Sequence, residues 1–216
     1  MKVENVNSPS FRALPVSNIK LKGINSNYKL FECTPDDAKF LESLAFDVDL
    51  KKLMPSIPPW KLDLWGMLLR HSIIFSEEGA NKILIEACDN VPCGILNYFP
   101  SDECYRLNYL VAVPDRVGHR VPLAGRVMCN ELFRRFLKSD ASKIELTAMN
   151  NTPFDPKSKY RQMGFFTVSD DGYSAFMRGW RDNILKAFEE QNEYISVKRI
   201  ENPQEVDLGK ILSVQI

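Results

Sequence analysis

Apolar residues recur along the chain with two different periods, and the period changes several times between its ends. Short runs with alternating or continuous apolar residues predict strands, and longer runs with an apolar residue every third or fourth position predict helices. The predicted strands lie at residues 28–34, 82–89, 91–99, 104–113, 143–149, 165–169 and 173–179. The predicted helices follow Thr34, cover residues 60–75, end near Lys138 and cover residues 157–164.

Turn and cap signals agree with these boundaries. Thr34 and Pro35 supply an N-cap and a first-turn proline for the first helix. The dipeptide Asp89-Asn90 separates two predicted strands and is typical of a tight hairpin. Gly164 marks the end of the short helix. Five apolar residues of the long helix fall on one face and are expected to be buried: Met128, Leu132, Phe133, Phe136 and Leu137.

The order of these elements predicts the class of fold. One strand and two helices precede three strands, and a loop, a helix, a strand, a helix and two strands follow. Hairpins pair neighbouring strands antiparallel, whereas a strand–helix–strand crossover makes a parallel pair. We therefore predict an α+β fold, a mixed sheet with helices on its faces, over residues 27–180.

The two ends of the chain differ from this central region. Residues 1–26 mix Asn, Ser, Pro and Lys with isolated apolar residues, and we expect a flexible N-terminal arm. Residues 181–216 are polar and helix-prone, then extended, and we expect an appendage rather than part of the core. The run ISVKRI in this tail has strand character, and a second subunit could pair with it, so a homodimer is one expected assembly.

The charge balance narrows the class of partner. The 216 residues include 28 Lys and Arg and 28 Asp and Glu, so the formal net charge is zero. Proteins that bind nucleic acid or anionic membranes usually carry a basic excess, and we expect neither partner. The first residues lack the apolar core of a signal peptide, and no apolar run approaches the about 20 residues that span a bilayer. The expected location is the cytoplasm.

The cysteines do not predict a metal site. The chain has five of them, no two spaced as CxxC, and only two histidines. A zinc site needs clustered ligands, so we expect no metal and buried free thiols in a reducing compartment. A pairing of Cys93 with Cys104 across neighbouring strands is the alternative.

The loop before the long helix is rich in groups that bind phosphate. Within eleven positions it holds Arg116, Gly118, His119, Arg120, Ala124, Gly125 and Arg126. Backbone N–H groups at a helix start and the positive end of its dipole attract anions, and the small pair Ala124-Gly125 lets a pyrophosphate approach closely. A basic, flexible turn before a helix is the alternative interpretation.

A second segment with candidate chemistry is the short helix that ends at Gly164. Tyr160 lies one turn before this glycine, and Phe165 returns the chain to the sheet. The purely structural interpretation is a capped amphipathic helix with a tyrosine that packs against the core. A phenol in this position can also donate a proton to a leaving thiolate.

Together the two segments resemble the GNAT superfamily of acyl-CoA-dependent N-acyltransferases, whose hallmark is (Q/R)-x-x-G-x-(G/A) after a Val-rich strand. Here LVAVP is followed by Arg120-Val121-Pro122-Leu123-Ala124-Gly125, with Leu123 in place of the inner glycine. The second signature, an Asn and then Y-x-x-x-G-F, matches Asn150-Asn151 and Tyr160 to Phe165. The resemblance covers residues 28–180. It implies a central mixed sheet of about six to seven strands flanked by about four helices.

The resemblance also implies roles for residues, with acetyl-CoA or another acyl-CoA as co-substrate and no metal. The matching positions that would bind the cofactor are Val111, Ala112, Val113, Arg120, Val121, Leu123, Ala124, Gly125, Arg126 and Asn151. Within this set, Val111 and Val113 match backbone contacts to pantetheine, and residues 120–126 match the pyrophosphate turn. Tyr160 matches the general acid for the CoA thiolate.

Two questions stay open at the level of sequence. The first is the general base, because Glu103 and Glu145 are the nearest carboxylates and Glu145 is expected to face solvent. The second is the acceptor, a small-molecule or peptide amine for which residues 35–76 suggest an apolar-walled site. The predicted function is N-acetyl transfer by direct attack of the amine. A degenerate relative that binds acyl-CoA or a protein partner without turnover is the alternative, and an unrelated α+β interaction domain is a third.

Overall fold

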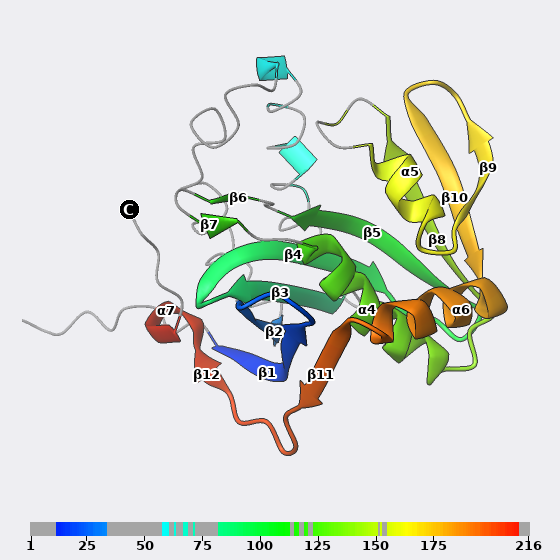
Figure 1. Cartoon of the computed structure of the whole chain (residues 1–216). Helices are drawn as coiled ribbons and strands as arrows, with labels where there is room; N and C mark the ends of the chain where they lie inside the picture. The colour runs from blue at the N-terminus through cyan, green and yellow to red at the C-terminus, as the bar shows by residue number, and fades with distance from the viewer. Residues whose placement is uncertain are drawn as a thin grey trace, which may run out of the picture.

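Strands far apart in sequence come together in one extended sheet (Figure 1). The computed structural model describes residues 12–33, 58–60, 63, 67–68, 71, 82–112, 115–116, 119–120, 123–150, 152 and 155–211. The sheet has the order β11-β1-β2-β3-β4-β5-β8-β10-β9, with β12 beside β1. Its strands are β1 (Arg12–Leu21), β2 (Asn27–Cys33), β3 (Lys82–Cys88), β4 (Val91–Phe99), β5 (Cys104–Ala112), β8 (Lys143–Met149), β9 (Phe166–Asp170), β10 (Ser174–Trp180), β11 (Ile195–Arg199) and β12 (Val206–Asp207).

The helices described are α4 (Ala124–Leu137), α5 (Pro156–Arg161), α6 (Arg181–Asn192) and α7 (Leu208–Ile211). Neighbouring strands are antiparallel except β5 and β8, which the crossover through α4 makes parallel. The predicted α+β mixed sheet is therefore confirmed, with more strands than expected. Within the predicted loop before α4, β6 (Asp115–Arg116) and β7 (His119–Arg120) form a small separate hairpin.

The hairpin from β3 to β4 forms where the sequence predicts it. Its two turn residues, Asp89 and Asn90, have φ values of 49° and 65°. Positive φ at both positions is the geometry of a type I′ turn, which Asn and Asp tolerate better than other side chains. The Asp89 carboxylate also accepts a hydrogen bond of 2.9 Å from the backbone N–H of Asn27, which ties the turn to the start of β2.

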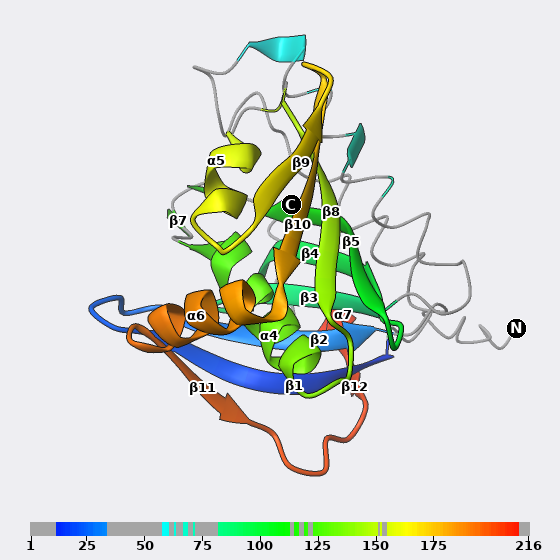
Figure 2. The ribbon, with the colours of Figure 1, turned by 90° about the vertical axis from the view of Figure 1, so that its right-hand side faces the viewer.

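Helix α4 fills one face of the sheet. Its side chains Val127, Met128, Leu132, Phe133 and Phe136 are fully buried, which confirms most of the predicted stripe. Helix α6 lies beside α4 on the same face, as Figure 2 shows. Burying aromatic and aliphatic side chains of this size contributes about 1.5–3 kcal/mol each, so this layer stabilises the fold strongly.

One acidic residue lies inside this core. Glu86 on β3 is completely buried, and neither of its carboxyl oxygens has a hydrogen-bond partner among the described residues. Burial raises its pKa well above the usual value. Opposite it on β4, Gly94 provides the space, because a Cβ there would clash with the Met128 methyl carbon and lie 3.1 Å from Glu86 Oε2.

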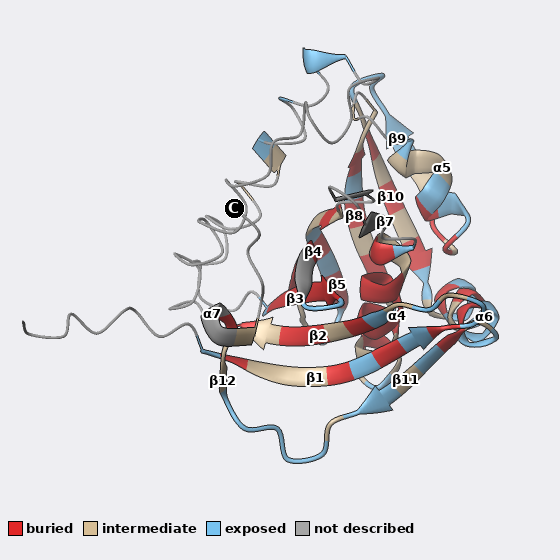
Figure 3. Ribbon diagram, turned by 60° about the vertical axis from the view of Figure 1, so that its left-hand side comes forward, coloured by how far each residue is buried: buried red, intermediate tan, exposed pale blue. Residues whose placement is uncertain are grey.

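The expectation of a flexible arm over residues 1–26 is wrong for Arg12–Leu21, which form β1. This strand pairs with β2 on one side and with β11 on the other, and Ala13, Ile19 and Leu21 are buried. A register shift between Pro15 and Ser17 interrupts the alternation, so the buried positions do not keep one period along the sequence. Figure 3 shows the buried and exposed positions along β1.

The tail from residue 181 is also part of the core rather than an appendage. Ile184, Ala187, Ile195 and Leu208 are buried, and the first three belong to the same apolar cluster as α4. The predicted order, helix and then extended chain, is confirmed by α6 and β11. The strand-like run that was expected to offer an edge to a second subunit forms β11, which pairs with β1 of the same chain at the end of the sheet, and the homodimer stays a prediction.

The remaining predictions from the sequence concern the two early helices, the cysteines, and membrane and metal sites. The predicted helix after Thr34 lies outside the described residues. In the predicted helix over 60–75, Trp60, Asp63, Met67, Leu68 and His71 are described, and all are helical. The five cysteines are buried free thiols. In the part of the chain that is described, no helix is long and apolar enough to cross a bilayer, and no group of three His, Cys, Asp or Glu side chains is placed to hold a metal.

Candidate active site

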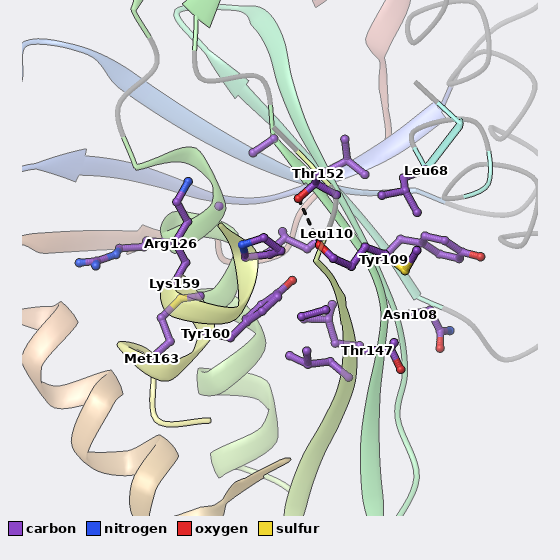
Figure 4. Close-up of a pocket in the computed structure, with 18 of the residues that line it drawn as sticks. Leu68, Asn108, Tyr109, Leu110, Arg126, Thr147, Thr152, Lys159, Tyr160 and Met163 are labelled. Carbon is purple, nitrogen blue, oxygen red and sulfur yellow. Dashed lines mark hydrogen bonds between the residues drawn. The ribbon is translucent and has the colours of Figure 1, made fainter. Parts of the chain in front are cut away.

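The parallel strands β5 and β8 separate, and a cavity lies where they do. They pair only from Cys104 and Lys143 to Leu107 and Leu146, although β5 continues to Ala112 and β8 to Met149. Residues of both unpaired ends line a cavity of about 1000 Å³. Helices α4 and α5 supply further lining residues, and Figure 4 shows the gap between the two strands with these side chains around it.

A bulge in β5 lies at the point where the strands separate. Leu107 pairs with Tyr98 and Tyr109 pairs with Asn97, so Asn108 is an extra residue on β5. A bulge bends its strand and increases the local twist, which explains why β5 turns away from β8 after Leu107. The Asn108 amide nitrogen lies 3.3 Å from Asn97 Oδ1, a contact that holds the bulge against β4. Both strands are left with unpaired backbone N–H and C=O groups facing the gap.

The start of α4 faces the same cavity with free backbone donors. Leu123, Ala124, Gly125 and Arg126 all line it. Leu123 occupies the N-cap position and has no side-chain cap, and the first turn contains no acidic residue. The N–H groups of Arg126 and Val127 already bond to the Leu123 carbonyl, whereas those of Ala124 and Gly125 have no partner among the described residues. These donors and the helix dipole make an anion-binding position.

Leu123 itself is held in an unfavourable backbone conformation. Its φ is 62° and its ψ is 16°, in the left-handed region, and its side chain is 39% exposed. Residues other than Gly, Asn and Asp rarely adopt this conformation, which costs about 1–2 kcal/mol. The position is the one where the sequence departs from the glycine of the GNAT pattern, so the backbone keeps the geometry of a glycine turn.

Gly125 is not required by the fold around it. A Cβ on this residue would lie 3.8 Å from the Leu110 Cδ2 atom and 4.0 Å from the Ala112 Cβ, which are ordinary contacts. A methyl group at this position would therefore fit without displacing its neighbours. A glycine at this position lets a bound anion approach the helix backbone more closely than any side chain would allow.

Tyr160 extends from α5 into the cavity with its hydroxyl group foremost (Figure 4). The residue is 8% exposed, and its ring packs edge-on against Phe165 with centroids 5.6 Å apart. The hydroxyl has no hydrogen-bond partner among the described residues. Burial, with a smaller effect of the Cys129 thiol, raises the pKa of Tyr160, so the phenol stays protonated. The cavity thus contains a free O–H donor.

Two cations lie near the helical side of the cavity. The Arg126 guanidinium donates to Gln162 Oε1 at 2.7 Å and to the Tyr194 hydroxyl at 3.2 Å. Lys159 lines the cavity from α5, and burial lowers the pKa of its amine. In Figure 4 both residues lie on the side of α4 and α5, away from Asn108 and Tyr109.

Not all predicted site residues can be placed. Val111, Ala112, Leu123, Ala124, Gly125, Arg126 and Tyr160 come together around the cavity. Arg120 is described only as backbone, in β7, and Val113, Val121 and Asn151 lie outside the described residues.

Sequence reasoning missed several residues of the cavity. Glu145 was expected to face solvent but lines it, together with Arg106, Thr147 and Phe176. These residues lie on the sheet face opposite α4, and only the pairing of β5, β8 and β10 reveals that they are neighbours. His71 also lines the cavity, with its ring 6.5 Å from that of Tyr109. Many of the residues around it in the sequence are apolar, so the sequence gives no signal of a site there.

Comparison with known proteins gives a fold and no sequence family. No family model matches the chain, and no curated protein matches its sequence. Among solved structures, the PaiA N-acetyltransferase of Thermoplasma acidophilum in complex with coenzyme A aligns with a TM-score of 0.51 and 16% identity, over 71% of this chain and 98% of that one. Aminoglycoside 6′-acetyltransferase type Ii aligns with a TM-score of 0.50 and 15% identity, over 70% of this chain and 96% of that one.

A third structure covers a larger share of this chain. FdhC, a nucleotide-linked sugar GNAT, aligns with a TM-score of 0.50 and 15% identity, over 82% of this chain and 94% of that one. At identities this low, the similarity lies in the arrangement of the backbone. In this chain the backbone forms a mixed sheet with a crossover helix and two parallel strands that separate. The chain therefore has the fold of the GNAT acyltransferases.

Proposed function

We propose that this protein is an acyl-CoA-dependent N-acyltransferase that transfers an acetyl group from acetyl-CoA to an amine by direct attack. The observation that carries the proposal is the cavity between β5 and β8, which has the free N–H groups of α4 on one side. Acyl-CoA joins a long, amide-containing arm to a pyrophosphate. A cavity with unpaired strand edges and an anion-binding helix start suits both parts.

The start of α4 would bind the pyrophosphate. Ala124 and Gly125 line the cavity, and their N–H groups have no partner among the described residues. Arg126 and Lys159 add positive charge nearby. The pantetheine arm would lie along β5 from Asn108 to Ala112. It would add its amide groups to the unpaired edge of the strand, as an extended peptide does when it joins a sheet.

Tyr160 would assist departure of the CoA thiolate. Its phenol is protonated and unpartnered in the cavity, so it can donate a hydrogen bond to the sulfur as negative charge develops there. The raised pKa of Tyr160 opposes full loss of its proton. The same burial also disfavours the thiolate and so raises the pKa of the CoA thiol. Proton transfer therefore depends on the difference between the pKa values of the phenol and the thiol, rather than on that of the phenol alone.

The amine must lose a proton before or during attack, and the structure favours a base other than Glu145. The Glu145 carboxylate is engaged by Arg178 and Lys143, and these hydrogen bonds lower its pKa although burial would raise it. A carboxylate held in this way is a weak base. A water relay or the imidazole of His71, which lines the same cavity, are the remaining candidates.

The experiment that tests the proposal combines binding with turnover. Thermal unfolding is measured with and without acetyl-CoA and desulfo-CoA, and free thiol release is then followed with a panel of amines. A ligand at 100 times its dissociation constant stabilises the folded state by about 2.7 kcal/mol, which is a shift of a few degrees for a chain of this size. No shift at millimolar concentrations of either ligand would contradict the proposal.

The alternative is a domain that binds acyl-CoA without turnover. Two observations favour it: the Leu123 side chain stands at the helix start, and Glu145 is occupied by cations. A thermal shift with desulfo-CoA, and no thiol release above the spontaneous rate with any amine, would support this alternative over catalysis.

A further inference from the structure

We infer that the acceptor is an amine that also carries a carboxylate, as an amino acid or a short peptide does, and that Arg106 binds this carboxylate. The inference rests on the proposed function, since it concerns the second substrate of the same cavity. It is carried by the charges on the face of the sheet opposite α4.

A row of charged side chains crosses three neighbouring strands on this face. Arg106 on β5 is the register partner of Glu145 on β8, and Glu145 is the partner of Arg178 on β10. Partners in register direct their side chains to the same face of a sheet. Lys143, two residues before Glu145, lies on this face as well. The four residues Arg106, Lys143, Glu145 and Arg178 are called the Glu145 cluster below.

The cluster has more positive charge than its one carboxylate can balance. Arg178 Nη2 and Nε lie 2.6 and 2.8 Å from Glu145 Oε1, and Lys143 Nζ lies 3.1 Å from the same oxygen. The other oxygen lies 3.6 Å from the Cys104 thiol. Arg106 makes no hydrogen bond or ion pair with any described residue. It is exposed and lines the cavity, so its guanidinium is available to a ligand.

This cation is separate from those that suit the phosphates. Arg126 and Lys159 belong to α4 and α5, whereas Arg106 precedes the bulge of β5, where β5 and β8 still pair. Around Arg106 the cavity offers the exposed Thr147 and the ring of Phe176, which are register partners on β8 and β10. A guanidinium, a hydroxyl and an aromatic wall fit a small acceptor with a carboxylate and an apolar part.

The same charges disfavour acceptors with several amino groups. Apart from Glu145, no described residue that lines the cavity carries a carboxylate, and Glu145 is already paired with two cations. A polyamine would bring positive charge next to Arg106 without an anion to receive it. Like charges at this range cost binding energy, so they select against such substrates.

The test uses acceptors that differ only in the carboxylate. Thiol release from acetyl-CoA is measured with phenylalanine, phenylalaninamide and phenylethylamine, with equivalent sets for other side chains and with dipeptides. Rates are compared per free amine, because the amine pKa differs within a set. We expect kcat/KM for the carboxylate form to exceed that for the amide by about tenfold or more, the effect of one charge-assisted hydrogen bond. Dipeptides show whether a free amino acid or a peptide is preferred.

Variants assign the preference to Arg106. In Arg106→Gln the preference for the carboxylate form should disappear, mainly through KM, with the KM for acetyl-CoA within about twofold of wild type; Arg106→Lys should keep part of it. The matched control is Arg161→Gln, an exposed arginine of α5 that bonds Thr167 and does not line the cavity. It should keep the full preference. Equal rates with acid and amide in the wild type, or an equal loss with both in Arg106→Gln, would overturn the inference.

A binding measurement distinguishes failure of this inference from failure of the proposed function. Thermal unfolding is measured with each acceptor in the presence of desulfo-CoA. A shift with carboxylate acceptors that Arg106→Gln removes would support the anion site even if no acceptor were acetylated or CoA did not bind. If CoA binds and no carboxylate-dependent shift or rate is found across the panel, the inference is wrong while the cofactor site stands.

Discussion

Arg178 on β10 holds the carboxylate of Glu145 on β8 through two of its guanidinium nitrogens, at 2.6 and 2.8 Å from Oε1. Lys143 contributes a third contact of 3.1 Å. The rings of Trp180 and Phe176 lie 5.3 and 5.8 Å from the guanidinium carbon and restrict its movement. Glu145 therefore holds Arg178 and Lys143 together on the sheet face opposite α4, and it neutralises part of their charge.

This relationship predicts a pH-dependent effect of Glu145→Gln. Burial would raise the pKa of Glu145, but the hydrogen bonds from Lys143 and Arg178 lower it overall. Stability from such a group is present above its unfolded pKa, near 4.3, and is lost as pH falls through the lower folded value. The variant should unfold at a lower temperature than wild type at pH 7, with the difference closing below about pH 4. Glu205→Gln, at an exposed pair with Arg12, should show almost no difference. A pH-independent deficit would contradict the explanation.

Tyr160→Phe should lower kcat by 10²–10⁴-fold, the usual contribution of a general acid–base group. The cavity keeps its shape because only the hydroxyl is removed, so the thermal shift with desulfo-CoA should remain. Because the pKa of Tyr160 is raised, its titration should not appear as a break in the pH–rate profile at neutral or mildly alkaline pH. A loss of less than about tenfold in kcat would show that another group protonates the thiolate.

Gly125→Glu should abolish the thermal shift with acetyl-CoA. The side chain would enter the space beside Leu110 and Ala112, and its charge would repel a pyrophosphate at the start of α4. Gly125→Ala is the matched control, because its methyl group makes only ordinary contacts and alanine favours the helix. The alanine variant should be as stable as wild type or more so. Unchanged CoA affinity in Gly125→Glu would remove the anion site from this helix.

Leu123→Gly should change stability by less than about 1 kcal/mol and increase affinity for CoA. Glycine removes the cost of the left-handed conformation but adds a similar freedom to the unfolded chain. It also removes an exposed side chain from the helix start. Leu123→Ala separates these effects, since it shortens the side chain and keeps the strain. Calorimetric titration with desulfo-CoA measures both variants, and weaker binding in both would mean that the leucine contacts the ligand.

Glu86→Met should stabilise the protein, with a gain that grows from pH 5 to pH 8. The buried carboxyl has no partner among the described residues, and methionine has a similar shape without that cost, about 1–3 kcal/mol in protein cores. Burial raises the pKa of Glu86 in the folded protein. The wild-type protein therefore has its full stability from this group below the unfolded pKa and loses it as pH rises toward the folded pKa, whereas the methionine variant does not. Chemical unfolding at several pH values measures the gain. A destabilised variant would show that Glu86 makes a favourable interaction.

What the sequence predicts well is local. The Asp89-Asn90 turn, the Gly164 stop and the buried stripe of α4 depend on neighbouring residues. The structure confirms the turn, the stop and all of the stripe except Leu137, which is only partly buried. Strand β1 was missed because the bulge after Pro15 breaks its alternation, and its partners lie elsewhere in the chain. The inferred role of Arg106 could not be predicted for the same reason. Its neighbours Glu145 and Arg178 come from strands whose pairing depends on the crossover through α4.

The pairing of β1 with β11 has a consequence for synthesis on the ribosome. Ser17 is paired with Arg199, so the outer edge of β1 is covered only after residue 199 has emerged from the ribosome. At about 5–20 residues per second this delay lasts roughly ten seconds or more. During that interval the nascent chain exposes an unpaired strand edge to other chains. Lys20 and Lys22, at the end of β1 and just beyond it, place positive charge beside this edge and would discourage premature pairing while the C-terminal strand is still being made.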